Sequence, residues 1–487
     1  MIRIFNTLSG RKQAIAKPRG KRQFRMFVCG PTVYDDAHIG HARTYFAFDA
    51  LAQYLRSRDF PVFYLQNITD IDDKIIERAR KFNQSPEDLA RTMERLYLRD
   101  MKQLGITSVN RYARATQFIP QIISQIRTLI KKGYAYEIPG SGWYFDIARF
   151  KDYGKLSRRT VAQAEDAISR VDEAHAKRNK GDFTLWKFVS VPEHLGKKRD
   201  YSRVIINSEP AWNTSLGWGR PGWHIEDTAI SEHFFGPQYD LHGGAHELTF
   251  PHHEAEIAQQ EAASGKKPFV KTWMHTGLLR INNEKMSKSL GNFVTIKEFL
   301  EHHPALLLRW LILSHHYRSP VNYTEKTLQQ AEDSLRSLTS FLARLHFIEE
   351  HAPHISGRIF PQIIFERFER SFHASLENDF NTGAAFAEIF SFIDSLHKKI
   401  WNCSRGEAKK ARLLITRLLK SLGITIPISR LPQSIKQELK KRELCRDNKQ
   451  FVQADSLRKE LLALGYEVED TPLGPFAWKQ TWQQRKN

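Results

Sequence analysis

The chain has 487 residues, of which 41% are hydrophobic and 26% charged, proportions typical of a globular protein with a sizeable core. Because 74 Lys and Arg outnumber 54 Asp and Glu, the formal net charge is +20, which favours a polyanionic partner. No apolar run approaches the ~20 residues that a membrane span needs, and the start lacks the apolar core of a signal peptide, so we expect no membrane association. At ~150 residues per domain, the length predicts about three domains.

The cysteines and the basic residues narrow the class of protein. Cys29, Cys403 and Cys445 form an odd, widely spaced set, which argues against a disulfide framework and predicts a cytoplasmic location. Residues 3–25 hold eight Lys and Arg and no acid, and residues 397–420 hold eight against one acid. Charge alone leaves two interpretations equally open, a phosphate backbone as partner or ordinary solvated surfaces.

Strand-like and helix-like segments alternate from residue 24 onward. The pattern predicts strands at 24–28 and 62–65 and helices at 40–58 and 73–81. This βαβ rhythm is typical of a parallel, nucleotide-binding sheet. The sequence therefore predicts an α/β fold for this part of the chain.

The turn between the first strand and the first helix spans residues 29–41 and reads CGPTVYDDAHIGH. Its two histidines, His38 and His41, stand three apart at the expected helix start. Free backbone N–H groups and the positive end of the helix dipole favour an anion there. The turn is therefore a candidate phosphate site, although an isolated H-x-x-H is a weak signal.

The later segments predict three further regions. Between about 112 and 207 the pattern loosens into helices and polar loops, and sheet-forming residues return after Leu241 and lead to the lysine loop, residues 285–289, KMSKS. From 324 to about 422 apolar residues recur at helical spacing, which predicts a helical bundle. A proline-containing break at 424–432 precedes a small terminal module.

Several long motifs carry a family resemblance. They are CGPTVYD at 29–35, NITDIDDK at 67–74, GRPGWHIE at 219–226 and FPHHE at 250–254. Together with His38, His41 and the lysine loop, they make the chain resemble the cysteinyl-tRNA synthetases, a family of class I aminoacyl-tRNA synthetases, from about residue 5 to 478. The resemblance implies a Rossmann-type parallel sheet with an inserted connective domain, followed by a helical bundle and an anticodon-binding module. The expected parts are a catalytic domain (1–111 and 208–300), a connective insertion (112–207), a stem (301–323), a helical bundle (324–425) and an anticodon-binding module (430–487).

The resemblance implies a two-step reaction. L-cysteine and ATP would give cysteinyl-adenylate and pyrophosphate, and the cysteine would pass to the 2′-hydroxyl of the terminal adenosine of cysteine tRNA. In-line displacement needs positioning and charge neutralisation, which His38, His41, Lys285 and Lys288 would supply together with Mg²⁺. The implied ATP-binding residues are Gly40, Glu247 and Lys288. Glu247 stands where the family usually has aspartate.

The family's zinc ligands correspond to Cys29, Asp227, His252 and Glu256. His252 and Glu256 stand four apart on a predicted helix and share one face. Asp227 replaces a cysteine but keeps its charge, and Zn–O bonds of ~2.0–2.2 Å need only a small contraction from ~2.3 Å. One Zn²⁺ per chain is therefore feasible, with weaker selection against harder ions. The alternative is that Asp227 caps a helix at Thr228 and no metal binds.

The metal would also explain how cysteine is selected over amino acids of similar shape. A hydrophobic pocket alone discriminates between such near-isosteres by only ~1–3 kcal/mol, whereas zinc can bind the substrate thiolate directly. The cysteine-binding residues implied by the resemblance are Cys29, Thr69, Trp223 and His242. Trp223 fits an ordinary core residue as well. The acidic cluster of Asp70, Asp72 and Asp73 lies near the substrate pocket in relatives, but its spacing fixes no role.

The terminal module matches the family's anticodon-binding pattern. The residues that would meet the GCA anticodon are Arg446, Phe451, Asp455 and Asp470. Phe451 replaces a tryptophan and can still stack on a splayed base. On local pattern alone, Arg446 and Asp455 fit a helix-surface pair better.

With these motifs, phosphate contacts to tRNA become the favoured interpretation of the basic runs. The stretch 189–210 is longer than in typical relatives, and its basic residues 197–199 fit an RNA-facing loop or a neutral insertion. Two other functions stay open: a ligase that couples cysteine to a small amine, whose members lack the anticodon module, and a catalytically inactive tRNA-binding paralogue, suggested by Asp227 and Glu247. We expect a monomer.

Overall fold

The computed structural model describes residues 1–159, 176–192, 200–206, 208–287, 290–353, 359–428 and 430–479. The chain divides into two compact units. The first comprises Met1–Leu278, Phe293–Lys297 and Arg318–Pro320, and the second Leu279–Asn292, Glu298–Tyr317 and Val321–Asn487. Among the described residues, no helix combines the length and apolar character needed to cross a membrane. The five expected domains divide the chain more finely, and their bounds stay a prediction.

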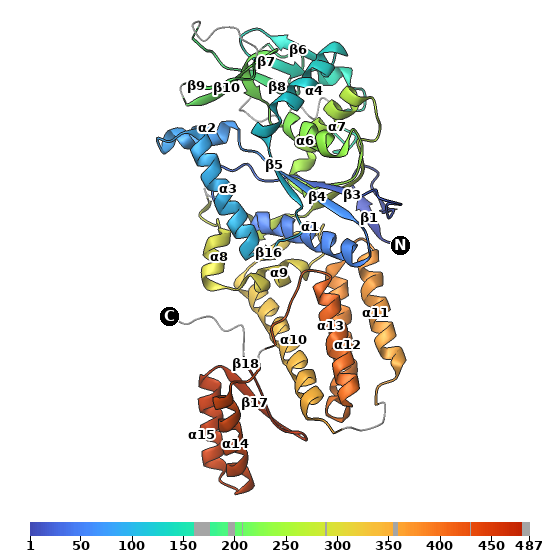
Figure 1. Ribbon diagram of the computed structural model, residues 1–487, viewed down its shortest axis with the longest axis vertical. Helices are drawn as coiled ribbons and strands as arrows, with labels where there is room; N and C mark the ends of the chain where they lie inside the picture. The colour runs from blue at the N-terminus through green and yellow to red at the C-terminus, as the bar shows by residue number, and fades with distance from the viewer. Residues whose placement is uncertain are drawn as a thin grey trace. The chain divides into compact units, whose positions relative to one another are not determined.

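A five-stranded parallel sheet lies at the centre of the first unit (Figure 1), as the sequence predicts. Its order is β13-β12-β3-β4-β5, with all neighbours parallel. The strands are β3 (Phe24–Val28), β4 (Val62–Ile68), β5 (Arg111–Arg114), β12 (Tyr239–Ala245) and β13 (Val270–Thr276). The direction of winding reverses between β3 and β12. The carboxyl ends of these two strands therefore form a topological switch point, the usual ligand position in such sheets.

Helices cover both faces of this sheet (Figure 1), which is why its strands are buried nearly throughout. On one face lies α1 (Ile39–Ser57), whose Phe48 ring occupies the space that a side chain at Gly243 would need. On the other lie α4 (Ile119–Lys131), α6 (Ile225–Phe235) and α7 (His252–Ser264). The hairpin β1 (Arg3–Asn6)–β2 (Arg11–Ala14) and the helices α2 (Asp73–Lys81) and α3 (Pro86–Gln103) complete this part.

A six-stranded antiparallel sheet occupies much of the expected insertion, where we expected helices and polar loops, and its last two strands lie just beyond residue 207. Its order is β6-β7-β8-β11-β10-β9. The strands are β6 (Ala135–Ile138), β7 (Gly142–Phe145), β8 (Phe183–Phe188), β9 (Arg203–Ile206), β10 (Glu209–Thr214) and β11 (Gly217–Pro221). They are short, with four to six residues each, and so give only a weak periodic signal in the sequence. The basic residues 197–199 lie outside the described residues.

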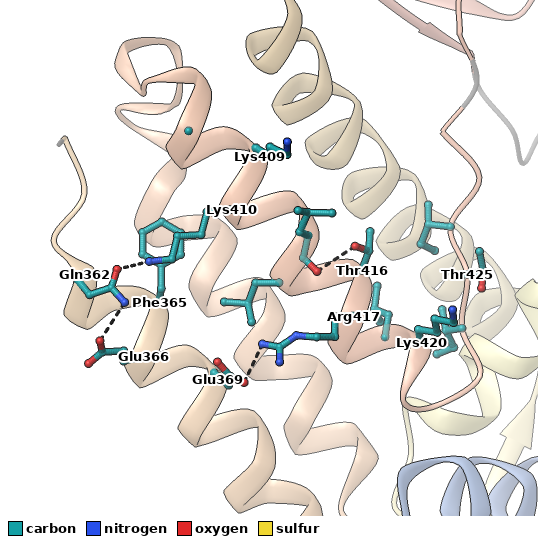
Figure 2. Close-up of a pocket in the computed structure, with 16 residues that line it drawn as sticks. Gln362, Phe365, Glu366, Glu369, Lys409, Lys410, Thr416, Arg417, Lys420 and Thr425 are labelled. Atoms are coloured by element: carbon teal, nitrogen blue, oxygen red, sulfur yellow. Dashed lines mark hydrogen bonds and ion pairs between the residues drawn. The ribbon is translucent and has the colours of Figure 1, made fainter. Parts of the chain in front are cut away.

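The second unit contains the helical bundle that the sequence predicts (Figure 1). Its helices are α10 (Glu325–His351), α11 (Gln362–Glu377), α12 (Thr382–His397) and α13 (Arg405–Lys420). Preceding them are a small sheet of β14 (Leu279–Ile281), β15 (Glu284–Lys285) and β16 (Val321–Tyr323), and the helix α9 (Ala305–Leu313). The helix α8 (Ile296–His302) begins in the first unit and ends in the second. A cavity of about 750 Å³ lies between α11 and α13, with Lys409, Lys410, Arg417 and Lys420 of α13 along it (Figure 2).

The terminal module pairs two helices with a hairpin. Its elements are α14 (Gln433–Asp447), α15 (Phe451–Ala463), β17 (Tyr466–Thr471) and β18 (Gly474–Lys479). The module packs on α10, where the rings of Phe347 and Phe476 lie 5.2 Å apart and Arg344 Nε donates to Glu469 Oε2 at 3.0 Å. The hairpin and the helices share a small apolar core around Leu439.

Candidate catalytic and metal-binding site

The turn after β3 is fixed by contacts to its two neighbouring strands. The Cys29 N–H donates to the Gly243 carbonyl on β12 at 3.0 Å, and the Gly30 N–H donates to Asn67 Oδ1 on β4 at 2.6 Å. A Cβ at Gly30 would lie 1.7 Å from the Asn67 carbonyl oxygen, so only glycine fits there. The Cys29 thiol is thereby held at the switch point.

Two histidines close the start of α1 as a reciprocal capping box. His38 is the N-cap residue, and its Nδ1 accepts from the Gly40 N–H at 3.1 Å. The His38 N–H donates in turn to His41 Nδ1 at 3.2 Å, and the two rings stack with centroids 3.9 Å apart. Because each Nδ1 accepts a hydrogen bond, each neutral ring carries its hydrogen on Nε2.

The electrostatics of this helix start suit an anion. Burial and the neighbouring His38 lower the pKa of His41 well below its usual range, so His41 is a neutral donor at pH 7. The first turn of α1 contains no acidic residue. The two Nε2–H groups therefore lie at the positive end of a helix dipole, with no carboxylate of that turn competing for them.

The four predicted metal ligands come together beneath this turn. Cys29 Sγ lies 3.3 Å from Asp227 Oδ2 and 3.9 Å from Glu256 Oε1. His252 Nε2 lies 3.1 Å from each of these carboxylates. All four side chains are buried. Around a tetrahedral zinc with bonds of ~2.0–2.3 Å, ligand atoms stand about 3.3–3.6 Å apart, so the spacing of this set suits such an ion.

The charge balance of the cluster also favours a cation. Burial and the nearby carboxylates raise the pKa of Cys29, and burial and Asp227 raise the pKa of Glu256. Among the described residues, no Lys or Arg pairs with Asp227 or Glu256, and Asp227 Oδ1 is buried without a hydrogen bond. Such groups need a positive partner when they ionise.

Asp227 is not the N-cap of a helix, so the capping role considered as the alternative is wrong, while metal binding by Asp227 stays a prediction. The N-cap residue of α6 is His224, and Asp227 is the third residue of the helix, 1% exposed. Its Oδ2 faces the cluster through the contacts given above. The same turn places Trp223 with its ring stacked on His252 at 4.3 Å, and Trp223 is 39% exposed rather than a core residue.

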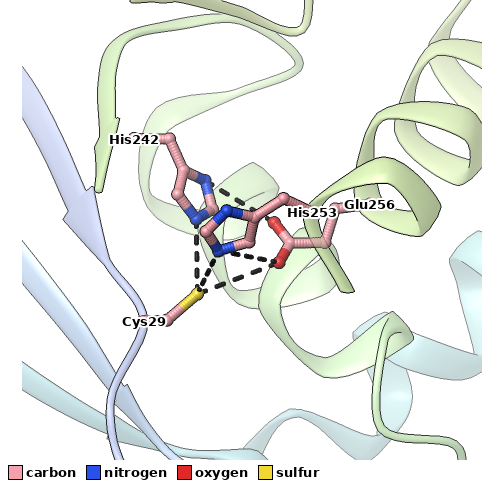
Figure 3. A group of neighbouring side chains, drawn as sticks. All are labelled: Cys29, His242, His253 and Glu256. Carbon is pink, nitrogen blue, oxygen red and sulfur yellow. Dashed lines mark hydrogen bonds and ion pairs between the residues drawn. The ribbon is translucent and has the colours of Figure 1, made fainter. Parts of the chain in front are cut away.

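A second set of ligand atoms shares Cys29 and Glu256 (Figure 3). It adds His242 of β12 and His253 of α7, whose Nε2 atoms lie 3.4 and 3.0 Å from Cys29 Sγ. His253 was missed in the sequence. Its neighbour His252 carries the i, i+4 pattern, whereas His253 comes to the thiol because α7 is buried on nearly all sides.

Each histidine of the cluster is held from outside. His224 Nδ1 lies 2.8 Å from His252 Nδ1, Tyr239 Oη lies 2.6 Å from His242 Nδ1, and His275 Nε2 lies 2.8 Å from His253 Nδ1. The pKa values of His242 and His253 are lowered, mainly because both rings are buried. The rings of His242 and His253 are therefore neutral, as metal-ligating imidazoles must be.

Thr69, a predicted cysteine-binding residue, is buried at the end of β4. Its Oγ1 donates to Glu226 Oε2 at 2.9 Å, and Glu226 is fully buried. Motif spacing alone does not single out Glu226, because only the folded position of α6 brings it to Thr69.

The acidic cluster has structural partners. Asp70 accepts from the Thr116 N–H at 2.9 Å and Asp72 caps α2. Asp73 pairs with Lys187 at 3.1 Å and with Arg220. These contacts tie the catalytic sheet to the insertion.

The remaining predicted ATP residues lie at two places. Glu247 is exposed in a short 3₁₀ helix after β12, at the carboxyl edge of the sheet. Lys285 is exposed on β15 of the second unit, where its carbonyl accepts from Asn292 Nδ2 at 3.2 Å. Lys288 lies outside the described residues. Their roles toward ATP stay predictions.

The terminal module places its predicted residues on α14, α15 and β17. Arg446 Nη1 lies 3.1 Å from Asp470 Oδ2, so its partner is Asp470 rather than Asp455. Phe451 is 58% exposed and Asp455 is exposed. An aromatic face and charged groups are thus available to a ligand.

Comparison with known proteins identifies the family. The model "tRNA synthetases class I (C) catalytic domain" matches residues 15–333. The chain is 42% identical to the cysteine–tRNA ligase of Thermoplasma acidophilum (96% of this chain, 98% of the relative) and 37% to that of Coxiella burnetii strain RSA 493 (98% and 99%). Methionyl-tRNA synthetase of Mycobacterium tuberculosis shares the fold, with a TM-score of 0.57 at 14% identity over 82% of this chain and 89% of that chain. The chain therefore belongs to the cysteine–tRNA ligases, within the class I aminoacyl-tRNA synthetases.

Proposed function

We propose that this chain activates L-cysteine with ATP and transfers it to cysteine tRNA with a GCA anticodon, acting as a monomer in the cytoplasm. One observation carries the proposal beyond family membership. A buried set of thiol, imidazole and carboxylate groups lies at the switch point of the sheet, directly before a helix start that presents two imidazole donors. A thiol substrate and a triphosphate thus have receptors at the two ends of one turn.

In the first step the cysteine carboxylate attacks the α-phosphorus of ATP and pyrophosphate leaves. The Nε2–H groups of His38 and His41, held by their Nδ1 contacts, donate to the phosphate oxygens as charge develops. Gly40 exposes its backbone to the nucleotide, Glu247 binds the ribose, and Lys285 and Lys288 neutralise the leaving pyrophosphate with Mg²⁺. The two imidazoles fit this task because their donor geometry is set before ATP binds.

Cys29, Asp227, His252 and Glu256 would hold one Zn²⁺. The ion supplies a soft partner for the substrate thiolate, which a serine hydroxyl cannot match. Trp223 stacks on His252 and keeps that ligand in place, while Thr69 and His242 complete the substrate pocket. Glu226 fixes the hydroxyl of Thr69.

The tRNA would contact the second unit through its charged surfaces. Lys409 and Lys420 on α13 make no hydrogen bond or ion pair within the described residues, so they can meet phosphates (Figure 2). Arg446, Phe451, Asp455 and Asp470 would bind the anticodon bases by stacking and hydrogen bonds. This folded module disfavours a ligase for small amines, which has no anticodon to read.

The test is cysteine-dependent ATP–pyrophosphate exchange without tRNA, followed by charging of a GCA transcript. We expect exchange with cysteine, none above background with serine, and charging that depends on the anticodon. Absence of exchange at every divalent metal supplied would refute the proposal. Exchange without charging of any tRNA would leave adenylate formation standing and refute the transfer step.

A further inference from the structure

A buried arginine lies beneath the exposed residues of the terminal module. Arg442 is on α14, one helical turn before Arg446, and its side chain is 1% exposed. Its Nη1 and Nη2 donate to Asp470 Oδ1 at 2.5 Å and Oδ2 at 3.0 Å. The guanidinium and the carboxylate therefore meet edge to edge, the geometry that fixes the plane of both groups.

Asp470 joins this buried arginine to an exposed one. Its Oδ2 also lies 3.1 Å from Arg446 Nη1, and the side chains of Arg446 and Asp470 are 43% and 44% exposed. An ion pair between two half-exposed side chains contributes little and leaves both free to rotate. Arg442 supplies what that pair lacks, a rigid and buried anchor for the carboxylate.

The burial of Arg442 depends equally on Asp470. Arg442 Nε is buried and makes no hydrogen bond among the described residues, so the contacts to Asp470 are the main compensation for desolvating the guanidinium. Asp455 adds a weaker favourable charge from α15. The aromatic face of Phe451 lies at the start of that helix and does not touch Arg442 in the described contacts.

We propose that Arg442 is the positioning residue of the anticodon site, holding Asp470, and through it Arg446, so that an acceptor and a donor stand side by side toward one base. This proposal rests on the proposed function. A carboxylate beside a guanidinium complements the Watson–Crick edge of an unpaired guanine, on which O6 accepts while N1–H and the N2 amine donate. A carboxylate that is free to rotate would not keep its oxygens aligned with the donors of the base.

The test compares discrimination rather than activity alone. The full-length chain and its variants charge a GCA transcript and a transcript in which adenine replaces the anticodon guanine, and the ratio of kcat/KM values is measured. We expect Arg442→Met to lower the ratio about tenfold, on the scale of one well-oriented base contact. Arg442→Lys should give an intermediate ratio, because it keeps the charge without the fork. Cysteine-dependent pyrophosphate exchange, which needs no tRNA, should stay unchanged in both.

A matched control and a double-mutant cycle separate positioning from folding. Lys441→Met removes a neighbouring exposed charge from the same helix and should keep the ratio. Arg442→Met combined with Asp470→Asn should lower the ratio no further than Asp470→Asn alone. If Arg442→Met slows charging of both transcripts equally, its role is only structural and the inference is wrong.

Two outcomes distinguish the inference from the proposed function beneath it. If Asp470→Asn lowers the ratio but neither Arg442 variant does, the anticodon assignment stands and Arg442 is not its positioning residue. If Asp470→Asn and Arg446→Met both keep the wild-type ratio, the anticodon assignment itself is refuted, and the inference with it.

Discussion

The cluster around Cys29 and the group around Asp470 hold their carboxylates in opposite ways. Asp227 and Glu256 are buried among histidines, with no Lys or Arg partner in the described residues, and burial raises the pKa of Glu256. Asp470 is half exposed between two arginines, and hydrogen bonds from Arg442 lower its pKa. The first arrangement has an excess of negative ligands and suits a cation. In the second, the arginines already balance the charge of the carboxylate. It therefore suits a ligand that is recognised by its pattern of hydrogen-bond donors and acceptors.

The difference shows how much of each region depends on an absent partner. The Cys29 cluster has no positive side chain among the described residues, so its full ionisation awaits a metal ion. The Asp470 group is complete without its ligand, because both oxygens of the carboxylate are bound by arginines. Changes in the first region should therefore be seen as lost metal, and changes in the second as lost selectivity.

The largest effect is expected for Cys29→Ala. It removes the only thiol of the predicted ligand set, so bound zinc should be lost and cysteine activation should fall by more than ~100-fold, beyond the range of outer contacts. Metal analysis and pyrophosphate exchange measure the two effects. Cys403→Ala is the control, since Cys403 is also a buried, unpaired thiol. Unchanged zinc content in Cys29→Ala would contradict the ligand role.

His41→Ala should slow activation by about 100-fold, the scale for losing one oriented donor to developing charge. Its ring provides an Nε2–H and also binds the His38 N–H, so both the phosphate contact and the cap are lost. Pyrophosphate exchange should fall while the Kd for tRNA stays nearly constant. His41→Gln is a useful partner variant, because a glutamine at this third helical position can still accept from the His38 N–H and complete the capping box. Equal losses of tRNA affinity and exchange would point to unfolding instead.

Asp227 gives the sharpest test of the metal site, with an expected loss of about tenfold in zinc retention and cysteine activation for Asp227→Ala. Asp227→Cys should retain or tighten zinc, because it restores a soft donor at the same position. Competition with a chelator measures retention independently of activity. Should Asp227→Ala keep both zinc and cysteine affinity, the second set with His242 and His253 would be the better candidate.

Phe451→Ala should weaken tRNA binding about fivefold, since one base–aromatic stack contributes ~1 kcal/mol or more. Exchange without tRNA should not change. Val452→Ala is the neighbouring control, because Val452 is even more exposed, at 86%. Phe451→Trp should bind at least as well as the natural chain, and a Kd for tRNA unaffected by Phe451→Ala would remove this residue from the anticodon site.

The sequence predicted those features that depend on a periodic pattern or on a fixed spacing within one motif. The parallel sheet, the start of α1 and the shared face of His252 and Glu256 follow from local periodicity and motif spacing. The six-stranded sheet of the insertion did not, because its strands of four to six residues are too short to show an alternating pattern.

Residues whose proposed roles depend on burial were also missed. Arg442 is one of several cations on a polar helix, and only the packing of the β17–β18 hairpin shows that it is buried. Glu226 and His253 are similar, since both face the site through helices that are buried on nearly all sides. Spacing along one element cannot report contacts that a second element creates.

The smallest effect is expected in the acidic cluster, where Asp70 is buried and Asp73 is paired with cations. Burial raises the pKa of Asp70 from 3.8 to about 6, so the folded chain binds this proton more tightly than the unfolded chain. The free energy of unfolding contributed by Asp70 is therefore lost as pH rises from about 4 to about 6. Asp70→Asn cannot ionise and keeps a group that can bond to Thr116. It should match the natural chain near pH 4 and exceed its stability by about 1–3 kcal/mol at pH 7, measured by urea unfolding.

Asp73→Asn is the opposite control, because Arg220 and Lys187 lower the pKa of Asp73. The stabilisation that Asp73 contributes is therefore present at neutral pH and disappears in acid. If both variants change the free energy of unfolding at pH 7 in the same direction, the difference between a buried and an ion-paired aspartate does not explain their effects on stability.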